Sequence, residues 1–121
     1  MSEIIKFTYD DIKTEAIPHG VGSVFCTMIW DLYWNMVDVY GFDEDYYNGT
    51  GGNNITMQLV LDGLKLQPCS PTFPESRDAI IAADIANNDG ANVCLIWETF
   101  ARRGLGYFAT AGANENFDTN P

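Results

Sequence analysis

The chain has 121 residues, of which 46% are hydrophobic and 13% aromatic. This length is a common domain size and the apolar fraction is ample for a core, so we expect one globular domain over residues 1–121. The formal net charge of -11 repels phosphate backbones and anionic lipids, which argues against nucleic-acid and membrane partners. No apolar run reaches the roughly 18 to 20 residues of a membrane span, and we expect no export signal in this chain.

Residues 20–40 form the longest periodic segment. Its apolar residues recur at steps of three and four, which places them on one face of a helix. They are Val21, Val24, Phe25, Met28, Ile29, Leu32, Tyr33, Met36 and Val37. Trp30, Trp34 and Val39 fall outside this stripe, so we expect the helix to be buried on much of its circumference. Cys26 lies on its apolar face and is interpreted as a buried thiol.

Residues 41–53 are rich in glycine and predict a surface loop. The acidic cluster Asp43 to Asp45 allows either a calcium site or a solvated turn, and the lack of regular calcium-loop spacing favours the turn. Two segments, Asn48-Gly49-Thr50 and Asn54-Ile55-Thr56, match the acceptor motif for N-glycosylation, which has meaning only in an organism that makes this modification.

Three further helices follow from local signals. One is expected over about residues 54–66. The next starts at a capping box of Thr72 and Glu75 and continues to about Asn88. The last spans about 91–103, ends with Arg102 and Arg103, and stops at Gly104. Residues 109–121 are polar and predict a loose tail. The sequence therefore predicts an all-α fold, a compact bundle of about four helices.

Three stretches of the sequence, taken together and in their order along the chain, form a specific pattern. They read PHGVGSVFCTMIWDL at 18–32, GGNN with QLVLDGLKLQPC over 51–69, and RDAI at 77–80 with FARRGLG at 100–106. Over about residues 8–108 they resemble the C-terminal region of the fungalysin family of zinc metallopeptidases, and more distantly the C-terminal helical subdomain of thermolysin-like enzymes. The resemblance implies a secreted, extracellular parent enzyme whose cleft lies between this subdomain and a zinc-binding half.

The zinc motif of such enzymes cannot be built from these residues. It requires two histidines four residues apart with an adjacent glutamate, and the chain contains one histidine. We therefore expect no cofactor in this chain and no peptide cleavage by it alone, while the resemblance implies zinc in the complete parent.

His19 is the one candidate catalytic residue. The resemblance suggests that it stabilises the charged tetrahedral intermediate, which a positioned donor can do. The alternative is a helix-entry histidine with a structural bond. Glu15 could orient its imidazole or be solvated. Fungalysins commonly have glutamate in place of Ser23 and tryptophan in place of Phe25, and both departures are expected to fall beside the cleft.

Two functions remain open at this stage. The chain is either the C-terminal fragment of a fungalysin-like zinc metalloendopeptidase or a stand-alone helical interaction module derived from one. The expected partners are the missing zinc-binding half or a substitute protein, and peptide or protein substrate in the parent. An exported parent would also allow Cys69 and Cys94 to pair.

Overall fold

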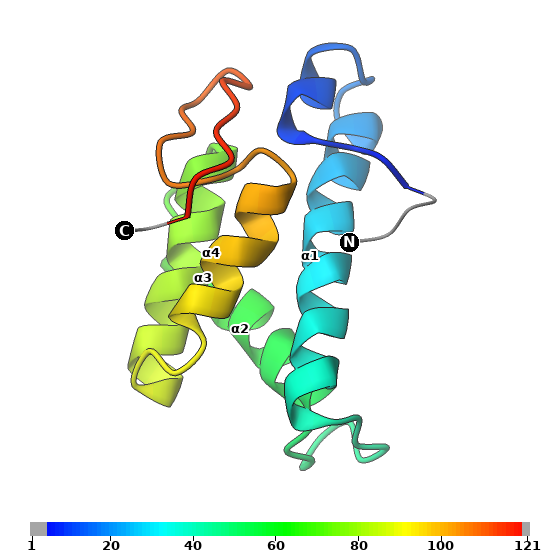
Figure 1. The fold of residues 1–121 in the computed structure, drawn as a ribbon, viewed down its shortest axis with the longest axis vertical. Coiled ribbons are helices and arrows are strands. Elements are labelled where there is room, and N and C mark those ends of the chain that lie inside the picture. Colours follow the sequence, from blue (N-terminus) through cyan, green and yellow to red (C-terminus); the bar gives the residue numbers. More distant parts are fainter. Residues whose placement is uncertain (1–4, 120–121) are drawn as a thin grey trace.

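A computed structural model describes residues 5–119, which form four α-helices and one short 3-10 helix (Figure 1). In chain order the elements are η1 (Tyr9–Lys13), α1 (His19–Tyr40), α2 (Gly52–Leu66), α3 (Phe73–Asn88) and α4 (Val93–Arg102). The only β pairing in this described range consists of two isolated bridges, Leu105 with Asn116 and Thr110 with Asn114. The predicted all-α bundle is confirmed. Over the same residues, no helix combines the length and apolar character needed to span a bilayer.

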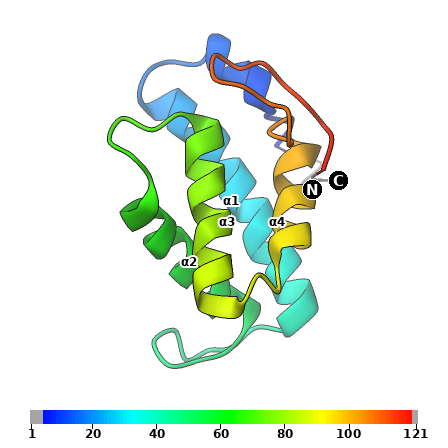
Figure 2. The ribbon, with the colours of Figure 1, turned by 90° about the vertical axis from the view of Figure 1, so that its left-hand side faces the viewer.

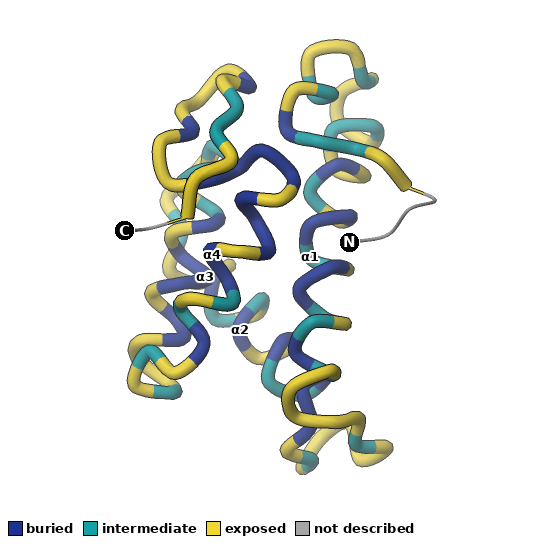
Figure 3. Tube along the Cα trace, viewed as in Figure 1, coloured by how far each residue is buried: buried dark blue, intermediate teal, exposed yellow. Residues whose placement is uncertain are grey.

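The long helix α1 buries one face and exposes the other. Val24, Met28, Leu32 and Met36 recur every four residues and are fully buried, with relative exposures of 0%. The other three α-helices all lie on that side of α1, as the burial colours show (Figure 3). The expectation that α1 is buried around much of its circumference is therefore wrong, because no described helix covers the opposite face.

Glycines in α2 allow it to approach its neighbours closely. A Cβ at Gly52 would lie 2.2 Å from the backbone oxygen of Met36 in α1, and one at Gly63 would lie 3.0 Å from Cγ1 of Ile80 in α3. The helix begins two residues earlier than predicted. The Asn54 side chain accepts a hydrogen bond from the Gly51 amide at 3.0 Å and so caps the first turn.

The predicted capping box starts α3. The Thr72 hydroxyl accepts from the Glu75 amide, while the Glu75 carboxylate accepts from the Thr72 amide at 3.1 Å. The helix ends at Asn88 as predicted. Asp84, which is fully buried, accepts hydrogen bonds from the backbone and side-chain nitrogens of Asn92, each at 2.8 Å. These bonds fix the turn that leads into α4 (Figure 2).

Residues 105–118 fold back onto η1. The prediction of a loose tail over 109–121 is therefore wrong for residues 109–118, and residues 120–121 lie outside the described part of the chain. The Tyr9 hydroxyl donates to the Thr110 carbonyl at 2.9 Å, and the Asp10 amide donates to the Glu115 carboxylate at 2.7 Å. Ala109 and Ala113 are buried, with 7% and 1% exposure. The short helix η1 was not among the elements predicted from the sequence. A short polar segment therefore becomes ordered because its backbone groups and small side chains pack against the N-terminal residues.

Arg103 joins three parts of the molecule. Its side chain is fully buried, its Nε donates to Asp31 in α1 at 2.7 Å, and its Nη2 donates to the other Asp31 oxygen at 3.2 Å. Its Nη1 donates to the carbonyls of Ile5 and Phe7, at 2.7 and 2.9 Å. The sequence placed Arg102 and Arg103 together at the end of the last helix, and in the structure Arg102 is exposed while Arg103 is buried. Arg103 is an internal crosslink.

Replacing Arg103 with leucine should destabilise the fold by about 3–5 kcal/mol, because it leaves the Asp31 carboxylate buried without a partner. Urea unfolding followed by circular dichroism measures this change as a lower midpoint. Arg102→Leu is the matched control, since Arg102 is exposed at the adjacent position. Equal stability losses for the two variants would contradict the role assigned to Arg103.

Burial raises the pKa of the Tyr9 phenol above its ordinary value, against smaller opposing effects of the Ala113 backbone and the Arg77 charge. The folded state therefore keeps the phenol proton at a pH where the unfolded chain has lost it. Stability should fall as pH rises from about 10 through the folded pKa. Tyr9→Phe should remove this part of the alkaline slope in urea midpoints measured between pH 8 and 11. An unchanged slope in that variant would contradict the assignment.

Candidate functional site at the start of α1

His19 is the first residue of α1 and its side chain is exposed. Its backbone carbonyl accepts a hydrogen bond from the Ser23 hydroxyl at 3.1 Å. Within residues 5–119, the hydrogen bonds and ion pairs of the chain do not engage the His19 ring. The imidazole is therefore available to a group from outside this chain. A helix start also carries the partial positive charge of the helix dipole, which favours an anion nearby.

The Glu15 carboxylate lies against the first turn of α1 but forms no hydrogen bond with His19 in the described structure. A Cβ at Gly20 would come within 2.8 Å of one Glu15 oxygen, so the glycine makes room for this side chain. A carboxylate at this position interacts favourably with the amides of the helix start. That Glu15 orients the imidazole stays a prediction.

The two residues that differ from the fungalysin pattern, Ser23 and Phe25, face different sides of α1. Ser23 is exposed one turn after His19 and shares its side of the helix. Phe25 instead turns into the protein, where its ring lies 5.2 Å from that of Phe73 and 6.2 Å from that of Phe100. Of these two residues, Ser23 therefore lies on the same side of α1 as His19, and its hydroxyl is bonded to the His19 backbone and not to the ring.

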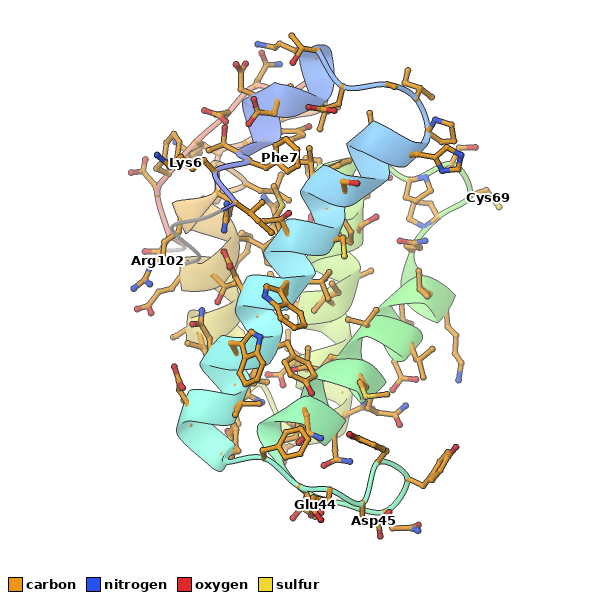
Figure 4. The ribbon with its side chains drawn as sticks, turned by 90° about the vertical axis from the view of Figure 1, so that its right-hand side faces the viewer. Lys6, Phe7, Glu44, Asp45, Cys69 and Arg102 are labelled. Carbon is orange, nitrogen blue, oxygen red and sulfur yellow. The ribbon has the colours of Figure 1, made fainter. Side chains whose placement is uncertain are left out.

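An aromatic cluster continues the exposed side of α1 beyond His19. The rings of Trp30 and Tyr33 are stacked with centroids 5.8 Å apart, and Trp34 meets both edge-on at 5.5 and 5.3 Å. Trp30 and Trp34 are 48% and 44% exposed. Figure 4 shows α1 in front of the bundle on this side. We define the outer face of α1 as His19, Ser23, Cys26, Trp30, Tyr33 and Trp34.

The three cysteines are free and exposed. The interpretation of Cys26 as a buried thiol is wrong, because the residue lies on the outer face of α1 and not on the core side. Cys69 projects from the connector between α2 and α3 (Figure 4), and Cys94 lies on α4. The disulfide that an exported parent would allow between these two residues is not formed in this structure.

The donor groups of this chain do not fit a catalytic zinc centre. Among the described residues, no cluster of three or more histidine, cysteine, aspartate or glutamate side chains could hold a metal ion. The acidic loop uses its carboxylates on its own backbone: Asp43 accepts from the amides of Asp45 and Thr50, at 2.9 and 3.1 Å. Asp45 accepts from those of Tyr47 and Asn48. These bonds describe a self-capped turn.

Comparison with known proteins establishes the family. The model of the fungalysin metallopeptidases (M36) matches residues 2–109, and the chain belongs to this family. It is 40% identical to an extracellular metalloproteinase of Pyrenophora tritici-repentis, over 96% of this chain and 19% of that protein. It is 42% identical to extracellular metalloproteinase 2 of Arthroderma gypseum, over 93% of this chain and 19% of that protein. The chain thus spans about a fifth of the length of these relatives.

The purified chain should not cleave casein in the presence of zinc, because its single histidine cannot form the zinc motif. Activity is measured by release of acid-soluble peptides, with 1,10-phenanthroline as a control for contaminating metalloproteinases. Zinc-dependent cleavage that copurifies with the chain, and that changes with His19→Ala, would contradict this expectation.

Proposed function

We propose that this chain forms the C-terminal helical wall of the peptide-cleaving cleft in a secreted fungalysin-type metalloproteinase. The family match and its confinement to about a fifth of each relative support this, because the relatives are named as extracellular metalloproteinases. The donor groups of the described residues do not fit a zinc centre, so the proposal assigns the metal to the part of the parent outside this chain. The substrate of the complete enzyme is a peptide or protein.

His19 is the proposed contribution of this chain to catalysis. The observation that carries the proposal is the position of its exposed, unbonded ring at the start of α1. A ring N–H placed there can donate to the oxygen that becomes negatively charged when a peptide carbonyl is attacked. The α1 dipole would add to the same effect, because its positive end lies at the helix start that carries His19.

The outer face of α1 is the proposed contact with the rest of the parent. Three adjoining aromatic rings supply large apolar area at low entropic cost, and such residues are enriched at protein interfaces. The face also begins with His19, so a protein that covers the aromatic cluster is brought next to the imidazole. One contact would then both complete the fold of the parent and define one side of its cleft.

A chimera tests the role of His19 in a complete enzyme. The matching segment of the Arthroderma gypseum relative is replaced by this chain, and the parent chimera is compared with its His19→Ala variant, which has no side-chain donor at this position. Loss of one donor to a developing oxyanion costs about 10²- to 10³-fold in kcat. We expect that loss in kcat with KM changed little, because the donor acts mainly in the transition state.

Two controls separate this role from a structural one. Zinc content and urea midpoints of the two chimeras should match, since the His19 side chain is exposed and unbonded in this structure. Ser23→Ala serves as the matched variant one helical turn away and should retain most of the activity. A His19→Ala chimera with unchanged kcat would show that His19 is only a helix-entry residue.

Binding of the rest of the parent to the outer face of α1 is tested with separated parts. This chain is added to the complementary part of the same relative, and proteolytic activity is titrated against chain concentration. Trp34→Ser should weaken assembly by about 30-fold or more, the size expected for an aromatic hot spot. Phe108→Ser, which changes an exposed aromatic outside the outer face, is the control. Equal effects of both variants would contradict the assignment.

A further inference from the structure

The two N-glycosylation acceptor motifs in this chain occupy different environments. Asn54 is the N3 residue of the first turn of α2, and both amide hydrogens of its side chain are in use. Its Nδ2 donates to the carbonyl of Asp45 at 2.9 Å and to that of Tyr46 at 3.2 Å, while its Oδ1 accepts from the Gly51 amide. This side chain closes the loop 41–51 onto α2.

The remainder of the second motif is also packed. Thr56 is 1% exposed, and its hydroxyl donates to the Gly52 carbonyl at 2.8 Å. A sugar on Asn54 would replace one of the two amide hydrogens and stand where the loop backbone lies. A glycan at Asn54 therefore requires the side chain to give up its hydrogen bonds to the loop carbonyls.

Asn48 differs in each of these respects. It is exposed in the loop between α1 and α2, and no hydrogen bond in the described structure uses its side chain. Its backbone amide donates to Asp45 at 3.1 Å, and that of Thr50 donates to Asp43. The loop is thus held from within by its aspartates. The Asn48 carboxamide and the Thr50 residue that completes the motif stay at its surface.

The loop also lies far from the proposed cleft. It follows the last residue of α1, whereas His19 is the first, and a helix of 22 residues is about 33 Å long. Figure 4 shows Glu44 and Asp45 of this loop at the end of the bundle remote from Lys6 and Phe7. A glycan there would not obstruct His19. It would shield the aromatic side chains of Tyr46 and Tyr47, which are 58% and 96% exposed.

We propose that Asn48 is N-glycosylated and Asn54 is not when this chain passes through a eukaryotic secretory pathway. The inference rests on the proposed secretion of the parent. The donor is an oligosaccharide linked to a polyprenyl diphosphate. The Asn48 Nδ2 forms a bond to the sugar C1 while the C1–O bond to the diphosphate breaks. The lipid diphosphate leaves with the bonding electrons, and the amide proton passes to a base of the transferase.

Expression in yeast behind a secretion leader tests the site directly, whether or not the natural parent is exported. Protein from the medium and from microsomes is treated with peptide N-glycosidase F in H₂¹⁸O, which converts each glycosylated asparagine into ¹⁸O-labelled aspartate. Chymotryptic peptides covering 48–59 are then sequenced by mass spectrometry. We expect the label at position 48 and not at 54. An untreated sample corrects for spontaneous deamidation at the Asn48-Gly49 bond.

Variants of the threonines that complete the two motifs make the result decisive. Thr50→Ala should abolish the glycan, and Thr50→Ser, which keeps the motif, should retain it. Thr56→Val removes only the second motif at nearly constant side-chain volume, so it should leave the glycan in place. Label at Asn54 in secreted protein, or none at Asn48 in either fraction, would overturn the proposal. Neither result bears on the His19 chimera, so the two proposals fail separately.

Discussion

The buried ion pair between Arg103 and Asp31 holds together the parts of the molecule that determine where His19 stands. The guanidinium uses two nitrogens on the carboxylate in α1 and a third on the carbonyls of Ile5 and Phe7. The Arg103 carbonyl in turn accepts from the Tyr9 amide at 2.7 Å. One residue thus ties α4 to the middle of α1 and to the segment leading into η1. The segment that leads from η1 to His19 therefore begins at a position that Arg103 holds in place.

Such a pair is tolerated in the core because its hydrogen-bonding capacity is nearly all used. Removing two charges from water is costly, and attraction offsets the cost only when the geometry is good and the remaining donors are satisfied. The fork of Arg103 meets both oxygens of Asp31, as a lysine could not. A second arginine, Arg77, likewise uses its guanidinium on groups inside the protein. Arg77 donates to the carbonyl of Gly106 and lies over the Trp97 ring at 4.6 Å, which positions the segment after α4.

The sequence predicts most of the helices because their signals are local. Periodicity alone locates α1 to within one residue, and the Thr72–Glu75 box locates the start of α3. The misses share a physical cause, which is partners distant in sequence. Arg103 resembles a solvated helix end until Asp31, 72 residues away, is brought beside it. Residues 109–118 look loose because the atoms that order them belong to η1.

The candidate site is only partly predictable for a different reason. His19 could be singled out by its resemblance to a family motif, and its exposure and free ring agree with an outward-facing role. The same resemblance placed Phe25 beside the cleft, but a helix turns by about 100° per residue, so positions 19 and 25 face different directions. Helical geometry separates Ser23, which shares the side of His19, from Phe25, which joins the core.

The two sides of α1 differ in role, because one builds the core of this chain and the other stays exposed. Val24, Met28, Leu32 and Met36 lie on the inner side, where α2 and α4 pack against α1 and α3 packs in turn on α2 and α4. The outer face carries an unbonded imidazole and a cluster of exposed indoles, groups whose interactions are not satisfied internally. The core therefore sets the direction of α1, and that direction determines which side chains the outer face presents.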